Sequence, residues 1–380
     1  MKKALDITHE ITKLVKYSPR RDNIFKDLKG EMAPSSPGIR VLCPTRWTVR
    51  AGSMRSIIDN YHVLQKLWDE AAEIVRDSET IARIRGVAAQ MRTFDFFWGL
   101  LLGECLLRNT DNLSKTLQKK FSASEGHLVA CQTKQTIMRM RNEESYDLFC
   151  KKVLTMADDD TIDLAEPVLP RKRRAPSRLE DGNAPPEFHS TPSDMYRQVY
   201  YEAIDLLVQT IEDRFDQQGY NIYCCLEELL LKAIQKKDYS EEFKTVTDVY
   251  DTDLNVLNLK AHLDILSSNV SDENQITDIF DVKKHLQGLT KAERDLIKEV
   301  IVLMKLILVM PATNSSSERS FSAMRRVKTY LRSTMKQERL NSLMILHIHK
   351  EYTDNIPMVD IANEFISKSD RRKQVFGTFI

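Results

Sequence analysis

The sequence predicts a mainly α-helical protein, and three observations predict it. Glycine and proline number only 11 and 12 among 380 residues, fewer than a turn-rich β protein needs. Apolar residues recur at three- and four-residue intervals through most of the chain, which is the period of an α-helix. Sustained alternation of apolar and polar residues, the mark of a strand, is hard to find. Long amphipathic helices are therefore expected.

The apolar period locates these helices in order. It predicts helices over 54–68, 81–101, 124–155, 196–215, 226–234 and 291–310. The fourth is expected to stop at Gly219, because glycine commonly follows a helix end. The last contains IVLMKLILVM just before Pro311, which fits a buried helix or a helix that enters a strand. The first 44 residues are interpreted as one helix and a loop.

A composition shift over 158–194 interrupts this pattern. Prolines and opposed charge blocks gather there with almost no apolar period, which predicts an exposed, mobile loop. Within it, Arg171, Lys172, Arg173 and Arg174 form a basic cluster. This cluster is either a nuclear import signal or simply a solvated loop, since short basic runs are common.

Composition excludes several classes of protein. Lys and Arg total 56 against 55 Asp and Glu, so the net charge is close to zero. A protein that coats nucleic acid through a large positive charge is therefore disfavoured. The six cysteines show no zinc spacing, which indicates reduced intracellular thiols and no metal site. No apolar run reaches the length of a membrane span, so no membrane association is expected and the protein is predicted to be cytosolic or nuclear. The sequence has no nucleotide-binding motif and no motif of a catalytic nucleophile. We therefore expect neither a cofactor nor a small-molecule substrate.

Two short motifs stand far apart in the chain. Thr45, Arg46 and Trp47 occur early, and PATNSSSERSFS runs from Pro311 to Ser322. Taken alone, Ser315 and Glu318 have the spacing of a helix capping box, which is far commoner than a catalytic glutamate. Trp47 taken alone is most simply a packing residue.

Together and in this order, the motifs resemble the hAT superfamily of DNA transposases, most closely the transposase-like regions of MYM-type zinc-finger proteins. The resemblance implies a ribonuclease-H-like fold interrupted by a helical insertion, with three carboxylates that hold two Mg²⁺ ions. Glu318 matches the third carboxylate. Arg46 and Trp47 match a motif implied to contact DNA, and Arg319 joins that nucleic-acid set.

The two family aspartates have no convincing match in this chain. They are expected upstream of Thr45, where Asp6, Asp22 and Asp27 all lie in helical or lysine-rich sequence. The resemblance therefore implies an N-terminal helix and loop over 1–44, a helical insertion domain over 45–290, and over 291–380 a ribonuclease-H-like remnant with the dimerisation helices. We expect a transposase-derived nuclear protein without catalytic activity, with DNA as a candidate partner. The alternative is the C-terminal part of an active transposase whose aspartates lie upstream.

Self-association is expected at the C-terminal end. Thr334 and Gln337 have the spacing of a second capping box, and the helix after them is apolar on more than one face. The family's dimerisation block lies over these positions. The dimerisation residues predicted there are Leu340, Leu343, Met344, Ile345 and Ile348.

Overall fold

A computed structural model describes residues 2–43, 49–118, 122–159, 161–169, 191–270, 276–309, 315–329 and 334–377. All regular secondary structure in these ranges is helical, so the mainly α prediction is confirmed. The described ranges hold no strand, and the ribonuclease-H-like remnant stays a prediction. The chain divides into two compact units, Met1–Ala312 and Thr313–Ile380.

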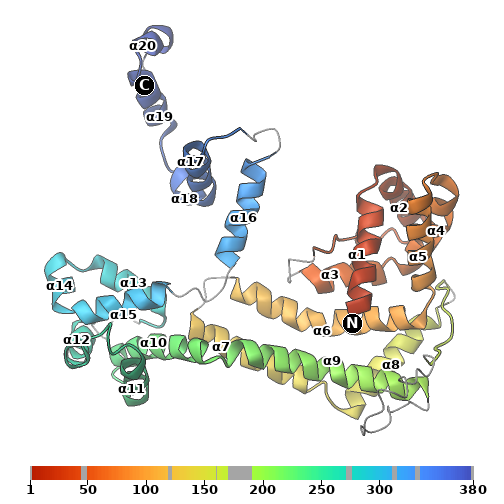
Figure 1. The fold of residues 1–380 in the computed structure, drawn as a ribbon, viewed down its shortest axis with the longest axis horizontal. Helices are drawn as coiled ribbons and strands as arrows, with labels where there is room; N and C mark the ends of the chain where they lie inside the picture. The colour runs from red at the N-terminus through yellow and green to blue at the C-terminus, as the bar shows by residue number, and fades with distance from the viewer. Residues whose placement is uncertain are drawn as a thin grey trace, which may run out of the picture. The chain divides into compact units, whose positions relative to one another are not determined.

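The first unit is built from α1 to α15 (Figure 1). Its first half comprises α1 (Lys2–Lys16), α2 (Pro19–Met32), α3 (Arg50–Ile58), α4 (Tyr61–Ile74), α5 (Ser78–Met91), α6 (Phe94–Leu117), α7 (Ala123–Met138), α8 (Glu143–Ala157) and α9 (Pro192–Phe215). Its second half comprises α10 (Gln218–Ile234), α11 (Ser240–Val249), α12 (Val256–Asn269), α13 (Ile279–Gly288), α14 (Lys291–Leu296) and α15 (Lys298–Val309).

Each half has its own hydrophobic core. In the first, α3 packs along α6 and α7 lies along α9 (Figure 1). Large aromatic side chains fill this core, with Tyr61, Trp68 and Phe97 almost completely buried. In the second, α10 packs on α11, α12, α13 and α15, and leucines such as Leu229, Leu263 and Leu303 are buried between them. The apolar residues that recur at the helical period in the sequence form the face of each helix that packs against its core.

Several predicted helices are two helices in the structure. The predicted helix over 54–68 breaks at Asp59–Asn60 between α3 and α4. The Asn60 side chain is fully buried, donates to the carbonyls of Pro37 and Ser56, and accepts from the Ser36 hydroxyl. Because these bonds need Asn60 to face inward, tertiary contacts override the continuous apolar period.

Two further breaks are marked by capping residues inside the predicted helices. Thr93 begins α6 by accepting a hydrogen bond from the Phe96 amide, which splits the predicted 81–101 helix. Asn142 caps α8 in the same way, which splits the predicted 124–155 helix. A side chain that accepts from a helix's first amides lets a new helix begin without interrupting the apolar period.

The N-terminal prediction of one helix and a loop was also wrong. Two helices occupy this stretch, because Ser18 caps α2 and Pro19 takes its first turn.

The expected stop at Gly219 is corrected as well. The fourth predicted helix ends at Phe215, and Gly219 lies inside the first turn of α10. The rings of Phe215 and Tyr220 meet with their centroids 5.3 Å apart, and the Tyr220 hydroxyl donates to the Ala123 carbonyl. Packing on α7 therefore decides where the chain bends, not the glycine.

The segment over 291–310 is helical, as α14 and α15, and the option of a strand is wrong for its described part. The two helices separate at Ile297, which leaves helical backbone and buries its side chain in the second core. No helix in the described ranges is long and apolar enough to cross a membrane.

A buried carboxylate joins the two halves of the first unit. Glu227 of α10 is only 1% exposed, and it accepts from the backbone amide and the hydroxyl of Ser124 at 3.0 and 3.3 Å. Burial raises the pKa of Glu227, while the bonds from the first turn of α7 oppose that shift. The contact satisfies helix-end amides that would otherwise be buried without an acceptor.

The start of the predicted exposed loop is held to the first core. Ile162 and Leu164 are half-buried against that core, and the Gln65 side chain exchanges hydrogen bonds with the Asp163 backbone. Arg92 forms an ion pair with the Asp163 carboxylate at 2.7 Å. The composition of the loop did not indicate this attachment. Arg171, Lys172, Arg173 and Arg174 lie outside the described residues.

Candidate dimerisation surface

The described residues of the second unit form five helices. They are α16 (Ser315–Val327), α17 (Gln337–Ile348), α18 (Lys350–Thr353), α19 (Met358–Ser367) and α20 (Asp370–Phe376). Among its described side chains, only Ala323, Leu340 and Ile366 are buried apolar residues. Three residues are too few for a hydrophobic core of normal size.

The α17 helix carries apolar residues on more than one face, as predicted. Leu340 is 7% exposed, and Leu343 and Met344 are half-buried on the same side. Ile345 and Ile348 are 60% and 45% exposed. Since α17 packs against α16, one face is covered within the chain and the isoleucine face is not.

The predicted capping box at the start of α17 was wrong. The helix begins at Gln337 with Lys336 at the capping position, and no side chain bonds the first amides. Thr334 lies two residues before the capping position.

Other apolar side chains of the second unit are exposed too. They include Phe321, Met324, Leu346, Tyr352, Ile356, Met358, Val359, Ile361, Phe365, Val375 and Phe376. So many exposed large apolar residues in 68 residues are typical of a surface that is covered in an assembly.

The predicted catalytic and DNA-contact residues are only partly visible. Glu318 and Arg319 lie in the first half of α16, while their side chains are outside the described part. Arg46 and Trp47 also lie outside the described residues. In the part of the chain that is described, no group of three or more His, Cys, Asp or Glu residues could hold a metal ion.

A carboxylate that the sequence analysis missed holds the helix after the Arg46–Trp47 motif. Asp111 of α6 is 3% exposed, and it accepts from the Ala51 amide in the first turn of α3 at 3.0 Å. Burial raises the pKa of Asp111 to about 6, against opposing effects from the Ala51 amide, Lys115 and Arg50. Nothing in the sequence around Asp111 singled it out, because the second half of α6 is polar at most of its positions.

We expect Asp111→Asn to stabilise the chain at pH 8 and to leave it unchanged at pH 4. A raised carboxyl pKa means that the folded state binds the proton more tightly, so ionisation of Asp111 costs stability as pH rises above about 4 to 6. Asparagine keeps an acceptor for Ala51 without the charge, and the expected gain at pH 8 is about 1–2 kcal/mol. Urea unfolding at both pH values measures it, and an equal gain at pH 4 would contradict the assignment.

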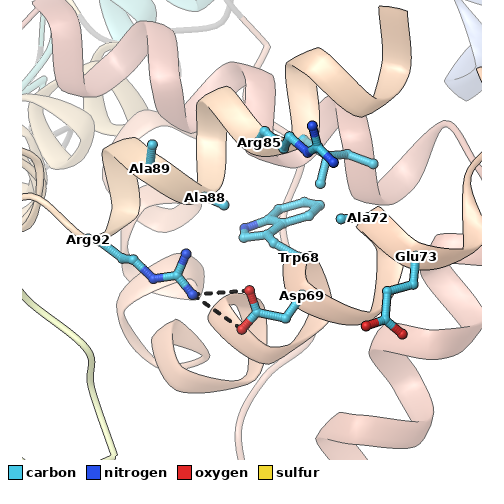
Figure 2. Close-up of a pocket in the computed structure, with 9 residues that line it drawn as sticks. Trp68, Asp69, Ala72, Glu73, Arg85, Ala88, Ala89 and Arg92 are labelled. Atoms are coloured by element: carbon cyan, nitrogen blue, oxygen red, sulfur yellow. Dashed lines mark hydrogen bonds and ion pairs between the residues drawn. The ribbon is translucent and has the colours of Figure 1, made fainter. Parts of the chain in front are cut away.

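A surface hollow of about 510 Å³ lies between α4 and α5. Figure 2 shows Trp68 lying in it, with Arg92 reaching Asp69 at one end and Arg85 and Glu73 at the other. The Trp68 indole N–H donates to the Met91 sulfur at 3.0 Å, and Arg92 is held by Asp69 and Asp163. The hollow therefore combines charges of both signs with a tryptophan that belongs to the core, which does not favour one class of ligand.

Comparison with known proteins identifies the C-terminal part of the chain. Residues 264–352 match the model of the hAT family C-terminal dimerisation region, which includes α16 and α17. The predicted resemblance to the hAT superfamily is thereby confirmed for this part of the chain. The closer likeness to MYM-type zinc-finger proteins stays a prediction.

Two curated relatives are similar along almost the whole chain. Both are named "52 kDa repressor of the inhibitor of the protein kinase". The human protein is 21% identical over 368 residues, and the mouse protein is 22% identical over 372. Each alignment covers 94% of this chain and 47% of the relative, so the chain spans about half the length of these relatives. No solved structure matches.

Proposed function

We propose that this chain, which matches the hAT family C-terminal dimerisation region over 264–352, is a transposase-derived protein. It associates with itself through the exposed face of α17. The observation that supports this most is the uncovered face of α17 at Ile345 and Ile348, within the matched residues. Leu340, Leu343 and Met344 support the same helix from its α16 side and fix its orientation.

A two-fold dimer would cover this face on both chains with one contact. In an isologous interface the same patch meets itself, so Ile345 and Ile348 of two chains would bury each other. Burial of apolar surface contributes about 25 cal/mol per Å², and isoleucine pairs are therefore effective in such a contact. The second unit has three buried apolar side chains among those described, so it would gain most of its core from the partner.

The proposed protein does not catalyse transposition by itself. Metal-dependent strand transfer needs three carboxylates around two ions, and Glu318 is the single family carboxylate that the sequence matches. The curated relatives are each named as a repressor, which supports a role other than transposition for this chain. Residual DNA contact through Arg46, Trp47 and Arg319 is part of the proposal.

Light scattering on the purified chain at tens of micromolar tests the self-association. We expect a mass of twice 44.0 kDa, or a larger multiple. A strictly monomeric chain would refute it. On the same sample, Mg²⁺-dependent cleavage of a transposon-end duplex that disappears in Glu318→Gln would refute the absence of catalysis.

We further propose that the chain resides in the nucleus and that its basic cluster directs it there. Arg171, Lys172, Arg173 and Arg174 provide the clustered positive charge that import receptors bind. Changing all four to alanine is expected to shift a fluorescent fusion from nucleus to cytoplasm. A nuclear signal that stays unchanged would make the cluster an ordinary solvated loop.

A further inference from the structure

The α19 helix presents an apolar stripe that lies beyond the matched dimerisation region. Met358, Ile361 and Phe365 follow one another at helical spacing and are all exposed. On the other side, Ile366 is 5% exposed where α19 packs on α20. The Arg372 guanidinium of α20 lies 4.0 Å from the Phe365 ring centroid and donates to the Phe365 carbonyl, which fixes the stripe's orientation.

The charges on α19 are acidic. Asp360 and Glu364 are its two charged residues, and both are exposed. Lys368, just after the helix, pairs with Glu364 at 2.8 Å. The helix therefore combines an apolar stripe with an acidic flank formed by Asp360 and Glu364.

The exposed face of α16 has the opposite character. Phe321 and Met324 are exposed, and Arg325 and Lys328 follow each of them four residues later, on the same face. Ala323, on the opposite face, is 7% exposed. The α16 face is thus apolar with positive charge at its C-terminal end.

We propose that α19 of one chain docks on this α16 face of a second copy, in antiparallel orientation. That orientation brings Asp360 and Glu364 to Lys328 and Arg325, and sets Ile361 and Phe365 against Met324 and Phe321. The inference rests on the proposed self-association and extends the interface beyond residue 352, where the family match ends.

The two faces point to a second copy as the partner. Both are exposed among the described residues of the second unit, where α19 packs on α20 and α16 packs on α17. In a two-fold dimer, α19 of each chain would pack on α16 of the other. Both faces would therefore be covered in both chains. Opposite charge at the edge of an apolar contact selects this pairing over others.

Charge reversal in two separate variants tests the docking. One variant carries Asp360→Lys and Glu364→Lys, and the other carries Arg325→Glu and Lys328→Glu. In a dimer of either variant alone, like charges meet at both α19–α16 junctions. Dimerisation should therefore weaken about tenfold or more at low salt. Mixed, the two variants form a heterodimer in which both junctions again join opposite charges, and the dimer should return.

The mixture separates docking between chains from docking within one chain. Docking within a chain would leave each variant repelled by its own charges, so mixing would restore nothing. Differently tagged chains followed by light scattering and affinity capture give the readout. As a matched control, Asp251→Lys with Asp253→Lys makes the same charge change at exposed residues outside α19 and should leave the dimer unchanged.

A neutral variant guards against a helix that fails to form. Ile361→Gln retains good helix propensity and the charge, but interrupts the stripe, and it should also weaken dimerisation. Variants that dimerise like wild type, or a mixture that is not restored, overturn the α19 proposal while the wild-type dimer still stands. A monomeric wild-type chain instead refutes the self-association on which the proposal rests.

Discussion

Ile345→Asp is expected to convert the dimer into a monomer. Ile345 is 60% exposed in the single chain, so the substitution adds little strain to the folded chain itself. In a two-fold interface it would bury two carboxylates close together, and each unpaired buried charge costs several kcal/mol. The dissociation constant should rise roughly a hundredfold or more. Light scattering over a concentration series measures it.

A matched substitution distinguishes the interface from a general loss of solubility. Leu206 of α9 is 62% exposed, and Leu206→Asp makes the same kind of change outside the second unit. This control should dimerise like wild type. If both variants are dimeric, Ile345 lies outside the interface. If both are monomeric, the loss is not specific to α17.

Trp68→Ala is expected to lower the free energy of unfolding by about 3–5 kcal/mol. The side chain is 1% exposed, and its indole N–H is bonded to the Met91 sulfur. Removing it leaves a large cavity between α4 and α5 beside the surface hollow. Chemical denaturation followed by circular dichroism measures the loss.

Arg85→Ala serves as the comparison on the same hollow. Arg85 is exposed at the rim, and its removal should change stability by no more than about 0.5 kcal/mol. A small effect of Trp68→Ala would contradict the assignment of this tryptophan to the core.

The helical character of this chain could be predicted from local sequence, because the 3.6-residue period records which side of each helix meets a core. The apolar stripe of 54–68 and the two-sided apolar pattern around Leu340 to Ile348 were visible in this way. The order of the Thr45–Trp47 and Ser315–Ser322 motifs gave the family resemblance, which the match over 264–352 confirms.

The helix ends and the buried acids could not be predicted, because residues distant in sequence fix them. Asn60 stops α3 through bonds to Ser36 and Pro37, and Asp111 secures the start of α3 from α6. Glu227 bonds to Ser124, which lies 103 residues away. Periodicity indicates whether a side chain faces the core, but it does not indicate which backbone amide donates a hydrogen bond to that side chain.

The sequence by itself thus determined that the chain is helical, that the helix around Leu340 to Ile348 is apolar on two sides, and that the chain resembles hAT proteins. Only the tertiary structure decided which of those sides is covered within the chain. Leu340 is buried and Ile345 is exposed although they are equally apolar, because α16 packs against one side of α17 and the other remains open. Burial depends on the neighbours that the whole fold brings to a helix, whereas the helix itself depends on residues three and four positions apart.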